Sequence, residues 1–294
     1  MIFQTLFSDP MSLVASICLL ATVISLWGSQ KKWVTGSLFF VYFIFSLLSH
    51  RMTLFSWLFL AVVAGFYIIF YRSKRVSLKV FSFIGFVSFA FVTFVHKTPG
   101  VTNWPLLSNY SLSLDSLPLK LYLGYDTPLI GVLILLFGHP LITSWKDWCV
   151  TLKKIFPIIV ILILLMIPTA LALGYVRFDP KFTATFLVWG LSNLFLTCVT
   201  EEAIFRGVLQ SGLIKLIGRF KYGPYLSIFI AATLFGLAHL AGGFAYVLLA
   251  GVAGLFYGYA YYRTGRIEAS ILTHFALNSF HFLLFSYPAL AIHL

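Results

Sequence analysis

The sequence predicts an all-α polytopic integral membrane protein with about eight to ten transmembrane helices in one bundle. Of the 294 residues, 61% are hydrophobic and only 10% are charged, whereas a soluble domain carries about 25% charged residues. The chain also contains a series of apolar runs close to the length of about 20 residues that crosses a bilayer. These runs lack the alternation of barrel strands, and only helices or closed barrels satisfy the backbone in lipid. The composition therefore excludes a cytosolic enzyme, a nucleic-acid module and a disordered scaffold.

The predicted helices follow one another with short connections. The apolar runs fall near residues 12–28, 33–49, 52–71, 80–95, 129–145, 155–174, 182–214, 224–241, 246–262 and 269–287. The first run is expected to be a retained span, because the residues before it lack the basic region of a cleaved signal peptide.

A polar interruption divides the chain. Residues 97–128 are rich in Ser, Pro, Asn and Leu and are expected to form a polar loop. Residues 1–96 are expected to form an N-terminal group of about four transmembrane helices. These helices are rich in aromatic residues, and no acidic residue lies between Met11 and Val95. Residues 129–294 form a second helical part and hold most of the ionisable residues that lie in apolar surroundings.

Basic residues predict the orientation of the chain, because Lys and Arg collect on the cytoplasmic side of a membrane. The densest group follows the third apolar run and consists of Arg72, Lys74, Arg75 and Lys79. Placing this turn in the cytoplasm puts Lys31 and Lys32 on the same side and both termini outside. The positive charges are scattered between apolar runs, so the net charge of +12 indicates orientation rather than nucleic-acid binding.

Ionisable side chains at membrane depth cost about 2.5–3.5 kcal/mol on insertion scales, so each is a candidate functional residue. Glu201, Glu202 and Arg206 lie within one apolar run. Glu202 and Arg206 are four residues apart, share a helix face and are expected to form an ion pair. Glu201 is rotated by about 100° and lacks a helical counter-ion, which makes it the candidate chemical group. The alternative is a single structural ion-pair network of all three side chains.

Two further polar groups lie on later apolar runs. His239 follows Phe235 by four residues, and His274 and Asn278 are also four residues apart. His274 and Asn278 therefore present an imidazole and a carboxamide from one helix face, which suits the stabilisation of an oxyanion. The alternative for a membrane histidine is a helix–helix hydrogen bond. His281 lies close to the same stripe and is expected to extend this polar seam.

The helix pair around residue 220 brings two of these candidates to one level. Glu201 and His239 each lie nineteen residues from that centre. A carboxylate and histidines in an enclosed site indicate hydrolysis, with Glu201 activating a water molecule that His239 orients. Glu201, His239 and His274 also match the residue types of a catalytic zinc site, although the HExxH motif is absent.

The motifs Glu-Glu-x-x-x-Arg (201–206), Phe-x-x-x-His (235–239) and His-x-x-x-Asn (274–278), in this order on hydrophobic helices, resemble the CPBP family. This is the CAAX protease and bacteriocin-processing group, also called Abi, which includes the type II CAAX prenyl endopeptidases. The likeness covers residues 200–278, with a weaker one at 125–131. It implies that residues 129–294 are a catalytic helical core and that the chain is an intramembrane endopeptidase.

The resemblance also implies roles for single residues. Glu201 is the water-activating carboxylate and His239 its partner, and His274 and Asn278 stabilise the oxyanion. Glu202 and Arg206 hold the first motif in place. The cofactor is left open by the resemblance: either a divalent metal such as zinc or none.

Two other functions are alternatives from different classes. One is a membrane transporter or channel in which the buried Glu and His side chains relay protons or bind a cation, although no inverted repeat is visible. The other is a catalytically inactive membrane scaffold. The expected partners are the lipid bilayer and a peptide or protein substrate, for which prenylation is one option, and no nucleic acid. The expected location is multi-pass in a prokaryotic plasma (inner) membrane.

Overall fold

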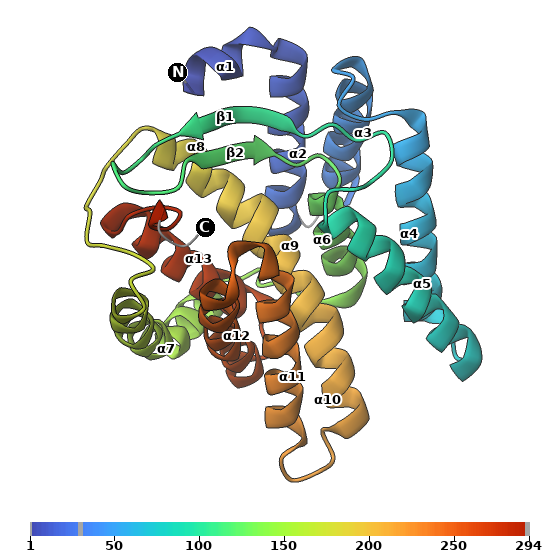
Figure 1. The fold of residues 1–294 in the computed structure, drawn as a ribbon. Helices are drawn as coiled ribbons and strands as arrows, with labels where there is room; N and C mark the ends of the chain where they lie inside the picture. Colours follow the sequence, from blue (N-terminus) through green and yellow to red (C-terminus); the bar gives the residue numbers. More distant parts are fainter. Residues whose placement is uncertain (1, 29–31, 292–294) are drawn as a thin grey trace. The chain divides into compact units, whose positions relative to one another are not determined.

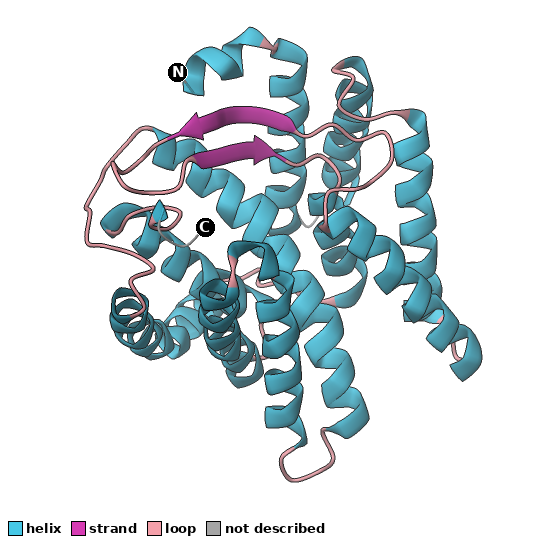
Figure 2. Ribbon diagram, viewed as in Figure 1, coloured by secondary structure: helices cyan, strands magenta, loops and turns pink. Residues whose placement is uncertain are grey.

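The computed structural model describes residues 2–28 and 32–291, and these residues are mostly helical (Figures 1 and 2). Lys31, which the orientation argument uses, lies outside the described residues. The helices before the polar segment are α1 (Ile2–Ser8), α2 (Pro10–Gly28), α3 (Lys32–Leu48), α4 (Leu54–Arg72) and α5 (Val76–Phe94). The helices after it include α6 (Thr127–Gly138), α7 (Trp145–Ala172), α11 (Gly223–Ala238), α12 (Phe244–Thr264) and α13 (Ile267–Leu284).

The predicted all-α fold of a polytopic membrane protein is confirmed. Among the described residues, five helices are long and apolar enough to cross a membrane, namely α2, α4, α5, α7 and α12. The helices α3, α6 and α11 are apolar but shorter. Helix α6 ends at Gly138, earlier than the apolar run predicts, because Pro140 follows and disfavours helical backbone in the residue before it.

Two short strands lie inside the polar segment, where the sequence analysis expected a loop. Strands β1 (Trp104–Tyr110) and β2 (Leu119–Leu123) form a two-stranded sheet. Along β2 the leucines are buried and the residues between them are exposed, as expected for a strand with one covered face.

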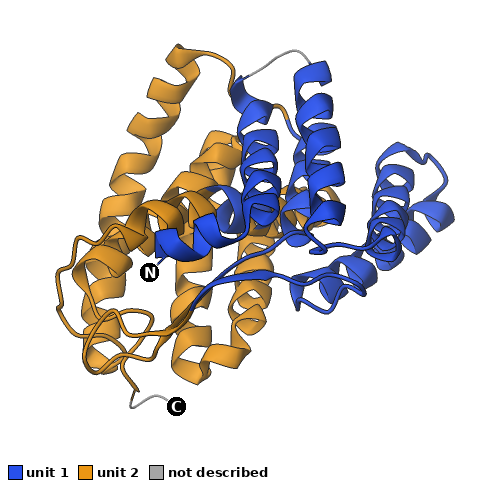
Figure 3. Ribbon diagram, turned by 90° about the horizontal axis from the view of Figure 1, so that it is seen from above, with its two compact units in different colours: residues 1–107, 121–139, 195–200 blue, residues 108–120, 140–194, 201–294 orange. Residues whose placement is uncertain are grey.

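The chain divides into two compact units (Figure 3). Unit 1 consists of residues 1–107, 121–139 and 195–200, and unit 2 consists of residues 108–120, 140–194 and 201–294. Helix α6 thus belongs with the N-terminal helices, whereas most of the candidate chemistry lies in unit 2.

Unit 1 is held together by packed helix pairs and by buried polar contacts. Helix α2 packs against α3, α4 packs against α5, and α6 contacts α2, α4 and α5. The Tyr125 hydroxyl donates to the Ser12 carbonyl over 2.8 Å, and Arg51 forms an ion pair with Asp9 over 2.8 Å. Gly131 of α6 approaches Thr200 so closely that a Cβ at position 131 would lie 2.9 Å from the Thr200 Cα.

Unit 2 is built on the pair of α11 and α12, against which α7 and α13 pack through α12. Glycines allow α11 and α12 to approach closely: a Cβ at Gly236 would lie 2.7 Å from the Val247 carbonyl oxygen. Helix α12 ends at Thr264, and the next residue, Gly265, caps it with a left-handed φ of 68°, which glycine adopts readily. Next, the buried Glu268 of α13 accepts a hydrogen bond of 2.6 Å from the Ile142 amide, which ties α13 to the connection between α6 and α7.

One long helix of unusual geometry runs from residue 185 to residue 217. It consists of α8 (Thr185–Ser192), the π-helical segment η1 (Asn193–Cys198), α9 (Val199–Glu202), the π-helical segment η2 (Ala203–Gln210) and α10 (Ser211–Ile217). The sequence predicts this helix but not its π geometry. π segments are rare and occur frequently at functional sites. Because η1 and η2 flank α9, which carries both glutamates, α9 is a candidate functional segment.

Candidate active site

The buried ion pair between Glu202 and Arg206 is present, as their spacing predicts. The Arg206 Nε lies 3.1 Å from the Glu202 Oε2, and the Arg206 Nη1 donates to the Glu202 Oε1 over 3.2 Å. Both side chains are 0% exposed. A fully buried charge without a counter-ion is strongly destabilising, so each of the two side chains needs the other to stay charged in this environment.

Arg206 has further partners on neighbouring helices. Its Nη2 donates to the Gly254 carbonyl of α12 over 2.9 Å. Its guanidinium carbon lies 4.7 Å from the centre of the Phe235 ring. One turn further along the chain, the Gln210 side chain donates to the Gly258 carbonyl over 2.9 Å. These contacts join η2 to α11 and α12.

His274 is held by the same carboxylate that binds Arg206. The Nδ1 of His274 lies 2.9 Å from the Glu202 Oε1, and because a carboxylate only accepts, Nδ1 carries the hydrogen. The His274 ring stacks on Tyr257, with ring centres 4.5 Å apart. Glu202 therefore orients His274 as well as pairing with Arg206, a contact that the sequence analysis missed.

Glu201 contacts His274, which links it to Glu202 and Arg206. Its Oε2 lies 3.9 Å from the Nε2 of His274. This carboxylate is 15% exposed, and its Oε2 is buried without a hydrogen-bond partner among the residues that the structure describes. The sequence predicts that Glu201 has no ion-pair partner on its own helix, and in the structure no described donor binds its Oε2.

His239 is positioned by the end of α11. It follows the last helical residue, and its Nδ1 lies 2.8 Å from the Phe235 carbonyl oxygen. A carbonyl only accepts, so the Nδ1 of His239 also carries a hydrogen, and its Nε2 is left for other chemistry. The ring packs edge-on against Tyr246, with ring centres 5.0 Å apart.

Asn278 contacts the long helix of residues 185–217 at Asn193, the first residue of η1. Its Nδ2 donates to the Asn193 Oδ1 over 3.2 Å. The sequence analysis did not identify Asn193, and the only available signal was an amide side chain within an apolar run, eight residues before Glu201.

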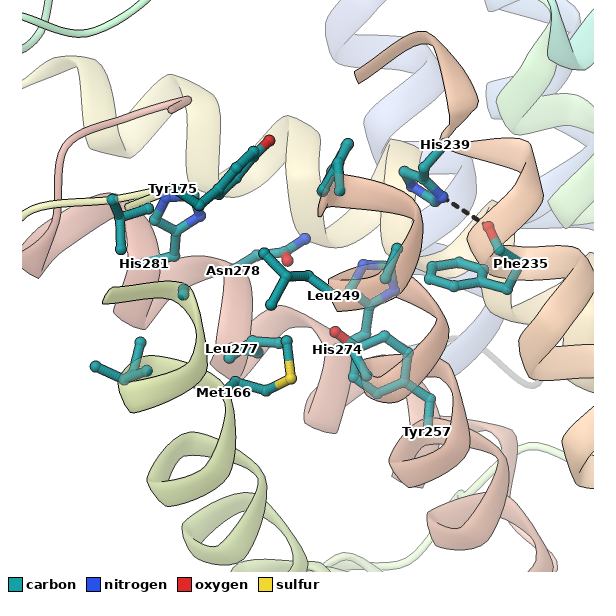
Figure 4. A pocket seen from close by; sticks show the side chains of 16 residues that line it. Met166, Tyr175, Phe235, His239, Leu249, Tyr257, His274, Leu277, Asn278 and His281 are labelled. Atoms are coloured by element: carbon teal, nitrogen blue, oxygen red, sulfur yellow. Dashed lines mark hydrogen bonds between the residues drawn. The ribbon is translucent and has the colours of Figure 1, made fainter. Parts of the chain in front are cut away.

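His239, His274 and Asn278 line one small cavity of unit 2 (Figure 4). The cavity has a volume of about 90 Å³, and its other walls are largely apolar, with Met166, Leu249 and Leu277 among them. His281 also lines it, and the His281 Nε2 lies 3.2 Å from the Ser286 carbonyl oxygen, in keeping with the expected polar seam. Glu201 is not among the lining residues and reaches the cavity wall through His274.

The zinc set suggested by the residue types does not fit the described geometry. Within residues 2–28 and 32–291, no group of three or more His, Cys, Asp or Glu side chains is arranged to hold a metal ion. Glu201, His239 and His274 are thus not grouped as a set of metal ligands among these residues. The three cysteines are free thiols on separate elements, α2, α7 and η1.

Comparison with protein families gives a match to part of the chain. Residues 183–280 match a family model described as type II CAAX prenyl endopeptidase Rce1-like. The matched segment begins just before the long helix of residues 185–217 and ends within α13, so it contains all six candidate site residues. No curated protein and no solved structure matches the chain.

Proposed function

The chain belongs to the CAAX protease family of membrane peptidases, and on this basis we propose that Glu201 activates the water molecule that cleaves the peptide bond. The observation that supports the proposal most directly is the contact series Glu201–His274–Glu202, with distances of 3.9 and 2.9 Å. The Glu202 carboxylate contacts both Arg206 and His274 within 3.2 Å, whereas the Glu201 carboxylate lies 3.9 Å from His274.

The Glu201 carboxylate suits a general base. A base must lie within reach of the proton that it removes, directly or through one water molecule, and such contacts are often long before substrate binds. Glu201 removes a proton from water, and the resulting hydroxide attacks the carbonyl carbon of the scissile bond. The protonated Glu201 then returns that proton to the leaving amine, so that one water molecule is consumed and the base is regenerated.

The histidines and Asn278 have supporting roles in this proposal. His274 and Asn278 donate hydrogen bonds to the oxyanion of the tetrahedral intermediate, and His239 orients the attacking water. For His274 this role needs a hydrogen on Nε2, because its Nδ1 already donates to Glu202. Asn193 orients the Asn278 amide through the 3.2 Å hydrogen bond.

The cavity favours an extended substrate in apolar surroundings. A space of about 90 Å³ holds a few water molecules or a carbonyl group with one water, but no folded segment. Its largely apolar walls keep bulk water away, which strengthens every electrostatic interaction inside. We propose a peptide or protein substrate that reaches the site from the bilayer, with a prenylated peptide as the first to test, in a prokaryotic plasma membrane.

Activity measurements on matched variants test this proposal. The full chain is purified, reconstituted in vesicles and supplied with a prenylated peptide, with and without a chelator. Glu201→Gln and His239→Ala are expected to abolish cleavage, while both proteins remain folded and inserted. The matched control is Glu268→Gln, which makes the same change at a buried glutamate of α13 and keeps an acceptor for the Ile142 amide.

The outcomes separate the alternatives. Full cleavage by Glu201→Gln would overturn the proposed role of this residue. Loss of activity in Glu268→Gln as well would indicate a general sensitivity to lost charge rather than a catalytic base. Ion flux through vesicles that is abolished by Glu201→Gln, without peptide cleavage in the wild type, would favour a transporter.

A further inference from the structure

A larger cavity lies in unit 1 and takes no part in the site described above. Its volume is about 660 Å³, within the range of about 300–1,000 Å³ that is typical of pockets for small ligands. It lies among α2, α3, α4 and α6, and almost all of its lining residues are apolar. We call it the α3–α4 cavity.

The α3–α4 cavity exists because two consecutive helices pack against different partners. Helix α3 packs along α2, whereas α4 packs against α5 and α6. Near their connection, α3 and α4 are joined by aromatic contacts: the Trp57 ring centre lies 4.9 Å from Phe43 and 5.6 Å from Phe39. The Trp57 Nε1 also donates to the Ser46 hydroxyl over 3.1 Å. The cavity is therefore closed at this end by an aromatic cluster.

The length of the cavity can be measured along α3. Its lining residues on this helix run from Lys32 to Phe43, eleven residues or about 16 Å of helix. Small residues on the facing walls, Gly36, Ala61 and Ala64, leave room between the helices. At Gly36 an added Cβ would meet no atom of the described residues within 4 Å. The result is a long, narrow apolar space.

The polar groups of the lining differ between its two ends. Lys32, the first residue of α3, is exposed and lines the end opposite the aromatic cluster. The lining hydroxyls are already used as donors, because Thr22 donates to the Cys18 carbonyl over 2.7 Å. Thr35 lies 2.8 Å from the Ser25 hydroxyl, which itself donates to the Thr22 carbonyl. The walls therefore offer few donors to a peptide backbone, and the charge sits at one end.

We propose that the α3–α4 cavity binds an acyl chain of an anionic membrane phospholipid, with the phosphate at Lys32 and the chain end at Trp57. A hydrocarbon chain needs length and apolar walls but no hydrogen bonds, which is what the cavity supplies. An anionic head group is favoured because Lys32 and the turn after α4, which carries Arg72, Lys74 and Arg75, belong to the predicted cytoplasmic side.

Native mass spectrometry of the detergent-purified full chain tests this proposal. The protein is titrated with phosphatidylglycerol and with phosphatidylcholine of identical acyl chains. The wild type is expected to retain phosphatidylglycerol at least tenfold more strongly than phosphatidylcholine. Gly36→Leu, which adds a side chain at a position that lines the cavity and has room for a Cβ, is expected to lose this retention. The matched control is Gly65→Leu on α4, where an added Cβ also meets nothing within 4 Å but which does not line the cavity.

A second variant separates the two parts of the proposal. Lys32→Gln is expected to remove the preference for the anionic head group while a lipid is still retained. Equal retention of phosphatidylglycerol by Gly36→Leu and Gly65→Leu would overturn the proposed cavity as its binding site. Retention of a prenylated peptide in place of phospholipid would overturn the proposed occupant. None of these outcomes depends on peptidase activity.

Discussion

Removing the Glu202 carboxylate is expected to unfold the site before it affects the chemistry. Glu202 is 0% exposed and contacts Arg206 at 3.1 and 3.2 Å and His274 at 2.9 Å. In Glu202→Ala a fully buried guanidinium remains without its counter-ion, a change that costs about 3–5 kcal/mol. The Gly254 carbonyl and the Phe235 ring still contact Arg206. A desolvated cation over an aromatic ring gains about 2 kcal/mol. We therefore expect the destabilisation by Glu202→Ala to lie at the lower end of this range, about 3 kcal/mol.

Thermal unfolding of the detergent-purified variants measures this effect. A loss of about 3 kcal/mol is a large part of the total stability of about 5–15 kcal/mol that proteins have, so Glu202→Ala should unfold at a clearly lower temperature and express poorly. Glu201→Gln should unfold at or above the wild-type temperature, because it removes a buried charge whose Oε2 has no hydrogen-bond partner.

The two adjacent glutamates should therefore give opposite results in stability and activity. Glu201→Gln is expected to be stable and inactive, whereas Glu202→Ala is expected to be unstable. If Glu202→Ala unfolds at the wild-type temperature, the argument that Glu202 compensates a buried Arg206 is refuted. Normal expression of that variant would contradict it in the same way.

Two further predictions follow from contacts outside these glutamates. Asn193→Ala removes a hydrogen-bond partner of Asn278 and is expected to lower kcat by roughly fivefold with little change in KM, since one hydrogen bond contributes about 1 kcal/mol; a raised KM at constant kcat would contradict this. Burial alone would raise the pKa of Asp9, but hydrogen bonds from Ser12 and Arg51 lower it below the usual value. A lowered folded-state pKa contributes stability above the unfolded-state pKa of about 3.9, and this stability is lost as the pH falls through the folded-state value. Unfolding temperatures of Asp9→Asn should lack that acid-dependent loss, and a loss equal to that of the wild type would contradict the assignment.

Features that depend on local spacing could be predicted from the sequence. The apolar runs predict the helices because a chain in lipid must satisfy its backbone internally. The ion pair of Glu202 and Arg206 follows from a spacing of four residues on one helix. The same reasoning leaves Glu201 without a partner on its own helix, and its nearest ionic contact, His274, comes from α13.

Features that depend on packing could not be predicted in this way. The bond between Glu202 and His274 joins residues 72 positions apart, and no periodicity in the chain relates them. The π segments η1 and η2 were missed because six and eight residues are too few for a change of helical period to show in the sequence. The alternation in β2 covers only five residues, too few to stand out among the Ser- and Pro-rich residues around it. Whether Glu201 and His239 meet, as their equal distance from residue 220 predicts, stays a prediction.

The paired hydrogen bonds from η2 to α12 limit how these two helices can move. Arg206 and Gln210 each hold one glycine carbonyl, at Gly254 and Gly258, with the same offset of 48 residues. Sliding α12 along η2 by a single residue would break both hydrogen bonds. The buried Arg206 guanidinium and Gln210 amide would then lose these acceptors, which is costly away from water. Rocking motions that keep the offset cost much less. Substrate entry is therefore easier to reconcile with movement of helices elsewhere, while this pair keeps a constant register.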